Sequence, residues 1–143
     1  VFLIFLFLKF LFFTTFSISE EYFNEGKNLF DNKDFDKSKF FFEKDIVFNP
    51  KSEKSYLYLA KIFHNDKNDL EEEINLNNVL LLNPKNDEAI YMFVLLKIKQ
   101  SDYNKAKELI ERFDLVCRSF CEKKKEIREK FEKLTPENAK EHN

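Results

Sequence analysis

Cys117 and Cys121 are the only cysteines in the chain, and they are four residues apart. Two nearby thiols without metal partners usually pair in an oxidising compartment, so we expect a disulfide that holds the short segment between them. A continuous helix fits a bridge of this spacing poorly, so the bridge requires a break between residues 117 and 121. One alternative is a pair of free, half-buried thiols, and another is a redox site.

Other residue patterns that could support catalysis or metal binding are weak. His64 and His142 are the only histidines, and neither has a second His or Cys at ligand spacing. The acidic stretch 64–73 contains several oxygen ligands but lacks the glycine of a calcium-binding loop, so it is interpreted as a polar turn. A single glycine also excludes Gly-rich phosphate loops and the nucleophile elbow. We therefore expect no catalytic residues, no metal site and no cofactor, and the protein is predicted not to be an enzyme.

The composition predicts a helical protein. The 143 residues include one Gly and three Pro, whereas 35% are charged, and an all-β fold would need more turn residues. The formal net charge is -2, with acidic and basic residues intermixed. Nucleic acid is therefore not expected as a partner, because phosphate binding needs a surplus of positive charge on one face.

The first 19 residues differ from the rest of the chain. Residues 1–16 are nearly all apolar and are interrupted by Lys9, and small residues follow at Ser17 and Ser19. This pattern predicts a cleaved secretory signal peptide, because the apolar part falls short of the ~20 residues that span a bilayer. The alternative is an uncleaved membrane anchor. Either form predicts export, to the periplasm or to the inner membrane facing it.

A period of 34 residues separates Pro50 from Pro84. At this period, apolar residues recur three and four positions apart, which predicts two amphipathic helices in each unit. Short polar turns are expected to join the helices of a pair at 32–34, 67–68 and 100–102. Each Pro ends the second helix. Ser52 after the first Pro, and either Asn86 or Asp87 after the second, are predicted to cap the next helix.

These residues resemble the tetratricopeptide repeat (TPR) family over residues 20 to about 116. The matching positions are Tyr22, Gly26, Phe35, Ser38, Phe42 and Pro50, then Tyr56, Leu59, Ala60, Phe63, Leu76, Val79 and Pro84, then Phe93, Tyr103, Ala106 and Phe113. Three positions depart from the pattern: Glu25 stands where a large apolar residue is usual, and Asp45 and Glu72 stand where a small one is usual.

The resemblance implies an all-α fold in which antiparallel helix pairs stack as a short right-handed α-solenoid. The units are 20–52, 53–86 and 87–116. A capping helix over 117–134 follows, with Ile127, Phe131 and Leu134 on its apolar side, and residues 135–143 form a polar tail.

In this family the first helix of each unit lines a concave groove that takes peptides or helices. Carried over to this chain, the partner-binding groove comprises Phe23, Lys27, Lys54, Leu57, Lys61, His64, Tyr91 and Leu95. Phe30 and Ile98 belong to the same register, although they could equally pack against adjacent helices. An apolar floor with basic flanks suits a protein or peptide partner with apolar anchors and some acidic residues.

The chaperone-binding members of the family use a Lys and Asn pair to hold a terminal carboxylate. In the first unit Phe23 and Lys27 stand in that register, so an acidic chaperone tail is disfavoured. The sequence thus predicts an exported, non-enzymatic interaction scaffold or adaptor in bacterial cell-envelope assembly. The alternatives are a membrane-tethered assembly factor and a small exported redox protein that uses Cys117 and Cys121.

Overall fold

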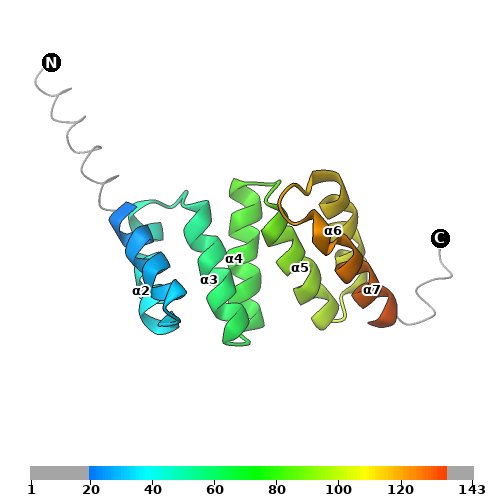
Figure 1. Ribbon diagram of the computed structural model, residues 1–143, viewed down its shortest axis with the longest axis horizontal. Helices are drawn as coiled ribbons and strands as arrows, with labels where there is room; N and C mark the ends of the chain where they lie inside the picture. The colour runs from blue at the N-terminus through cyan, green and yellow to red at the C-terminus, as the bar shows by residue number, and fades with distance from the viewer. Residues whose placement is uncertain (1–19, 135–143) are drawn as a thin grey trace, which may run out of the picture. The chain divides into compact units, whose positions relative to one another are not determined.

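The computed structural model describes residues 20–134, and every regular element in that range is a helix. Within the described range, residues 20–31 are helical, and we call this stretch the leading helix; the helices labelled in Figure 1 follow it. Their bounds are α2 at Phe35–Phe48, α3 at Glu53–Asn65, α4 at Asp69–Leu82, α5 at Asp87–Lys99, α6 at Tyr103–Val116, the 3-10 helix η1 at Cys121–Lys123 and α7 at Lys124–Leu134. The predicted all-helical fold is confirmed for this range. The expected signal segment 1–19 and tail 135–143 lie outside the described residues.

The two helices of each pair are joined by a turn that recurs every 34 residues. A residue with positive φ marks each turn: Lys33 at 64°, Lys67 at 57° and Ser101 at 60°. In the first turn Lys33 donates its N–H to the Phe30 carbonyl, and Asp34 donates to the Leu29 carbonyl, both at 2.9 Å. The same two bonds recur one and two periods later. They satisfy the last carbonyls of the first helix, so the sequence repeat is also a backbone repeat.

Polar side chains cap the start of the second helix in each pair. The caps are Asp34, Asn68 and Asp102, whose side-chain oxygens accept from the N–H three residues later. The predicted cap at Asn86 is confirmed, because its side chain accepts from the Ala89 N–H at 2.8 Å. Ser52 makes no such bond: its hydroxyl donates to the Ser55 hydroxyl at 3.1 Å instead. Ser52 therefore occupies the N-cap position of α3 as predicted, but the predicted side-chain bond to a helix N–H is wrong.

The third repeat ends differently from the first two. The residues that end the second helices are Asn49, Asn83 and Cys117, and each donates its N–H to the carbonyl four residues earlier. Pro50 and Pro84 follow the first two, whereas Arg118 follows the third. Helical structure resumes at Cys121 rather than at 117, because residues 117–120 form a loop. The capping segment therefore contains the break that a bridge between its cysteines requires.

The described chain divides into two compact units, with the boundary after Asn75 inside α4. In the N-terminal unit α2 packs against α3, and the core is formed by Phe42, Leu59 and Ile62. The leading helix approaches α2 at Gly26, whose carbonyl accepts from the buried Ser38 hydroxyl at 2.8 Å. A Cβ at position 26 would lie 2.9 Å from the ring of Phe42. Glycine is therefore needed at this helix contact, because such an approach is closer than van der Waals contact.

The C-terminal unit has its own core. In this unit α5 packs against α6, and α7 contacts both. Fully buried apolar residues from the three helices include Val94, Phe113 and Ile127. Of the residues predicted for the apolar side of the cap, Ile127 is completely buried and Phe131 is half-buried. Leu134 is 52% exposed, so its predicted place in the cap contact is wrong.

Two acidic residues occupy helix contacts where the repeat pattern has small residues. Asp45 is buried and accepts a short hydrogen bond from the Ser55 hydroxyl. Glu72 is also buried, and its two carboxylate oxygens lie 3.0 and 3.1 Å from Nδ1 of His64. Buried carboxylates are costly unless they have polar partners. These two departures from the pattern are thus accommodated by a partner on the adjoining helix.

Candidate functional site

An aromatic cluster lies where the leading helix meets α3, and Tyr58 is at its centre. The Tyr58 ring stacks on Phe42 with centroids 4.9 Å apart and an interplanar angle of 17°. Phe30 and Phe23 approach it edge-on, with centroids 5.0 and 5.9 Å away. Tyr58 was not among the predicted groove residues. Its position, four residues after Lys54 and three before Lys61 on one helix face, is a signal that could have identified it.

Two lysines of α3 lie over rings of this cluster, and a third lysine is on the leading helix. The Lys61 ammonium lies 4.9 Å from the Tyr58 centroid, and Lys54 Nζ lies 5.8 Å from the Phe23 centroid. Lys27 on the leading helix pairs with Asp31 at 2.6 Å, and this hydrogen bond raises the pKa of Lys27. We call the six residues Phe23, Lys27, Phe30, Lys54, Tyr58 and Lys61 the lysine-aromatic face. The arrangement presents cations beside aromatic rings, which suits apolar anchors and carboxylates together.

Two other predicted groove residues of the N-terminal unit make different contacts. Leu57 is only 9% exposed, so most of its surface already contacts the protein. His64 is half-exposed at the end of α3, where its Nδ1 faces Glu72. Their role in partner binding remains a prediction. A charged substitution at Leu57 would disturb the core, so it is a poor probe of binding.

Tyr91, the first predicted groove residue of the C-terminal unit, contacts the capping segment. Its hydroxyl donates to Glu126 Oε1 at 2.7 Å, and its ring lies 6.0 Å from the Phe120 ring. Burial and then the hydrogen bond to the Glu126 carboxylate raise the pKa of Tyr91 to about 12. Hydrogen bonds from Lys123 and then Tyr91 lower the pKa of Glu126. Sequence reasoning missed this contact because it joins residues 35 apart in the chain.

The remaining groove candidates of this unit are less accessible. Leu95 is half-buried, and Ile98 is 3% exposed. Ile98 therefore packs inside the protein, which is the alternative given for it above. The structure thus gathers most predicted groove residues of the N-terminal unit on one face, whereas those of the C-terminal unit largely contact their own unit.

A single carboxylate holds the loop at the end of the third repeat. Asp87 Oδ2 accepts from the N–H groups of Arg118 and Ser119, both at 2.6 Å, and of Phe120 at 3.0 Å. Partial burial of the carboxyl opposes ionisation, but the backbone N–H groups together lower the pKa of Asp87 below its ordinary 3.8. Three successive amides aimed at one oxygen form an anion-binding nest. Here a carboxylate of the same chain fills that nest.

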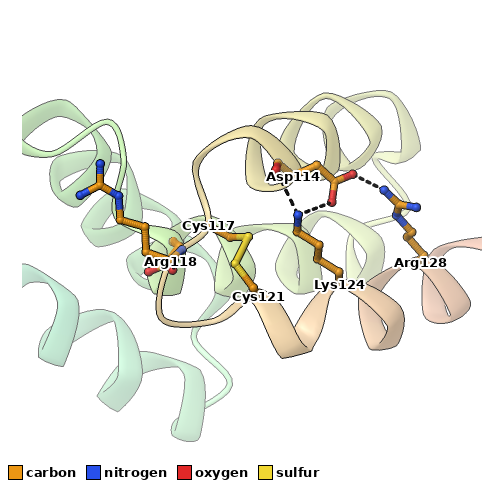
Figure 2. A network of polar contacts seen from close by, with 7 residues as sticks. Asp114, Cys117, Arg118, Cys121, Lys124 and Arg128 are labelled. Atoms are coloured by element: carbon orange, nitrogen blue, oxygen red, sulfur yellow. Dashed lines mark hydrogen bonds and ion pairs between the residues drawn. A yellow bond between two sulfur atoms is a disulfide. The ribbon is translucent and has the colours of Figure 1, made fainter.

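A second acidic residue attaches α7 to α6. Figure 2 shows Asp114 accepting from the side chains of Lys124 and Arg128. Lys124 Nζ donates to the Asp114 carbonyl oxygen at 3.1 Å and lies 3.7 Å from Oδ1. Arg128 makes a short ion pair with Oδ2. Both cations are partly exposed, so these ion pairs orient α7 more than they stabilise it.

Cys117 and Cys121 face each other across the same loop. Their Cα atoms lie 5.3 Å apart, and the structure joins their sulfur atoms, as Figure 2 shows. This Cα separation falls in the ordinary range for disulfides. Residues 118–120, which donate to Asp87, lie inside the ring that the bridge closes. The bridge and the Asp87 contact thus act on one loop.

Residues 20–134 contain no group of three or more His, Cys, Asp or Glu side chains placed to hold a metal ion. None of the helices in this range combines the length and apolar character needed to cross a membrane.

The raised pKa of Tyr91 predicts a late-titrating tyrosine. The hydroxyl contact with Glu126 stabilises the fold fully below the ordinary pKa of 10.0, and this contribution is lost as the pH rises toward 12. Carbon-13 NMR of labelled tyrosine, with Tyr91→Phe to assign the resonance, should find Tyr91 titrating near 12. Glu126→Gln should lower that value, and a Tyr91 that titrates near 10 in the unaltered protein contradicts the contact.

No family model matches the sequence, and no curated protein sequence matches it. Solved structures do resemble the fold. The first TPR domain of Spaghetti (RPAP3) bound to the HSP90 peptide SRMEEVD has a TM-score of 0.73 at 17% identity, over 82% of this chain and 94% of that one. The Arabidopsis OM64 TPR domain scores 0.76 at 16% identity, over 85% and 99%. A chain of a CopN-Scc3 complex scores 0.68 at 20%, over 78% and 67%. The chain therefore has the fold of TPR domains.

Proposed function

We propose that this protein is an exported, non-enzymatic scaffold that binds a segment of another protein on its lysine-aromatic face. The observation that carries the proposal is the clustering of Phe23, Phe30 and Tyr58, with Lys54 and Lys61 lying over two of these rings. The fold supports it, because helix-pair repeats commonly serve as binding surfaces.

The chemistry of the face favours an apolar segment that carries some acidic residues. Half-buried rings offer contact area to an apolar anchor, and rings contribute strongly at protein interfaces. Lys54 is exposed beside Phe23, and Lys61 lies over Tyr58, so both ammonium groups are near any anchor that contacts the rings. Carboxylates on the partner would meet these cations at the edge of the contact.

The structural neighbours are compatible with a peptide or protein partner. One is bound to the peptide SRMEEVD, which contains acidic residues, and another belongs to a two-protein complex. A chaperone tail remains disfavoured for this chain, since Phe23 and Lys27 stand where carboxylate-clamping members have Lys and Asn. We propose instead an internal segment of an envelope protein, which needs no terminal carboxylate.

Export is the second part of the proposal. Residues 1–19 have the composition of a signal peptide, and a disulfide between Cys117 and Cys121 would be stable in an oxidising compartment. We place the protein in the bacterial periplasm, in envelope assembly. The alternative form keeps residues 1–19 as an anchor in the inner membrane. A redox enzyme is disfavoured, because the bridge closes a loop that is already held by Asp87.

Charge reversal on the lysine-aromatic face should weaken partner binding. Lys54→Glu with Lys61→Glu replaces attraction for acidic residues by repulsion, and we expect roughly tenfold weaker capture of the partner. The measurement is quantitative affinity capture from the native envelope. The control, Lys107→Glu with Lys133→Glu, changes the net charge equally on exposed sites elsewhere. Equal capture by both double variants would show that another surface binds.

Cleavage of the signal should leave Glu20 as the first residue of the mature protein. N-terminal sequencing of the protein recovered from the cell envelope tests this directly. Recovery of the chain with residues 1–19 attached would establish the anchored form instead.

A further inference from the structure

The capping helix α7 has a small apolar contact of its own. It buries one residue completely, Ile127, while Phe131 is half-buried and Leu134 is 52% exposed. Its ion pairs to Asp114 come from partly exposed cations. Segments with few buried apolar side chains open locally at low free-energy cost. The position of α7 therefore depends on how the chain is held where it enters the helix.

That entry is the loop 117–120. Its amides at 118, 119 and 120 donate to one oxygen of Asp87, at the start of α5. They converge on one atom only while the loop is tightly curled. Cys117 and Cys121 have Cα atoms 5.3 Å apart, whereas four extended residues could span about 13 Å. The bridge thus removes the extended conformations in which the amides cannot reach Asp87 together.

We propose that the Cys117–Cys121 disulfide is a redox latch that keeps α7 docked over Tyr91. When the bridge is reduced, the loop gains conformational freedom and its contact with Asp87 weakens. The following helix then undocks, and the Tyr91 hydroxyl loses Glu126 while its ring loses Phe120. This inference rests on the proposed function in one respect: Tyr91 belongs to the predicted partner-binding set, so opening would make a covered residue of that set available.

The chemistry is thiol–disulfide exchange with an external dithiol. One thiolate of the dithiol attacks a sulfur of the bridge and forms a mixed disulfide, and the released cysteine thiolate takes up a proton. The second thiol of the reductant, as a thiolate, then displaces the other cysteine. Two electrons and two protons pass to Cys117 and Cys121, and the reductant becomes a disulfide. Reoxidation by an external disulfide reverses each step.

Hydrogen–deuterium exchange of the full chain, with and without dithiothreitol, tests the latch. We expect amides of 124–134 to exchange about tenfold faster after reduction, while α2 and α3 are unchanged. Cys117→Ser with Cys121→Ser should exchange at the fast rate with or without the reductant. Asp87→Asn should also exchange faster in the oxidised protein, and reduction should then add less than it does in the unaltered chain. Glu111→Gln, an exposed carboxylate on α6, is the matched control and should behave like the unaltered protein.

Two results would overturn the latch. One is equal exchange of 124–134 in oxidised and reduced protein. The other is full additivity of reduction and Asp87→Asn, because that shows that the bridge and the carboxylate act on different parts of the structure. Neither readout requires a partner. The latch can therefore fail while charge reversal still weakens capture, and it can hold even if the partner binds elsewhere.

Discussion

The constraint on which the structure depends is the turn that joins the two helices of each pair. A non-glycine residue in the left-handed region costs roughly 1 to 2 kcal/mol, yet Lys33, Lys67 and Ser101 all adopt it. The conformation is maintained because the N–H of each such residue and the N–H of the next one donate to carbonyls at the end of the first helix. Each turn brings apolar faces together that neither helix could bury alone. The lysine-aromatic face and the cap contacts both depend on that pairing.

Alignment of the chain at the 34-residue period shows that the end of the third repeat departs from the first two. Asn-Pro ends the second helix of the first two repeats, and the corresponding residues of the third are Cys117 and Arg118. Proline stops a helix by its covalent structure alone. The third repeat has no proline there. Its second helix is followed instead by a loop that the disulfide closes and that Asp87 holds through three backbone amides. A helix end that depends on a disulfide and on hydrogen bonds can be released by reduction, whereas a helix end that depends on proline cannot.

Much of the fold was predictable from sequence because its signals are local and periodic. Pro50 and Pro84 gave the period, and the polar turns gave the helix boundaries. The spacing of the cysteines required a helical break only if the two are bridged, and residues 117–120 do form a loop. One failure is the start of the capping helix, because residues 117–120 form a loop. The others concern single side chains: the Ser52 hydroxyl donates to Ser55 instead of accepting a helix N–H, and Leu134 stays exposed.

The candidate site was harder to predict for physical reasons. Position on a helix indicates which way a side chain faces, but not what lies opposite. Tyr58 was missed because its importance comes from rings on two other helices, and Tyr91 contacts a segment 35 residues away. Asp87 looked like an ordinary acidic residue at a helix start. Its partners are backbone amides of a distant loop, and every residue type except proline has such an amide, so the sequence does not indicate the contact.

We propose that a partner segment lies on the lysine-aromatic face of the N-terminal unit. Site-specific photocrosslinking in the native envelope tests it most directly, with benzoylphenylalanine placed either at Lys54 or at Glu43, an exposed residue on α2 of the same unit. The account predicts one discrete crosslinked partner from position 54 and none from position 43. A partner that crosslinks from position 43 and not from 54 would contradict it.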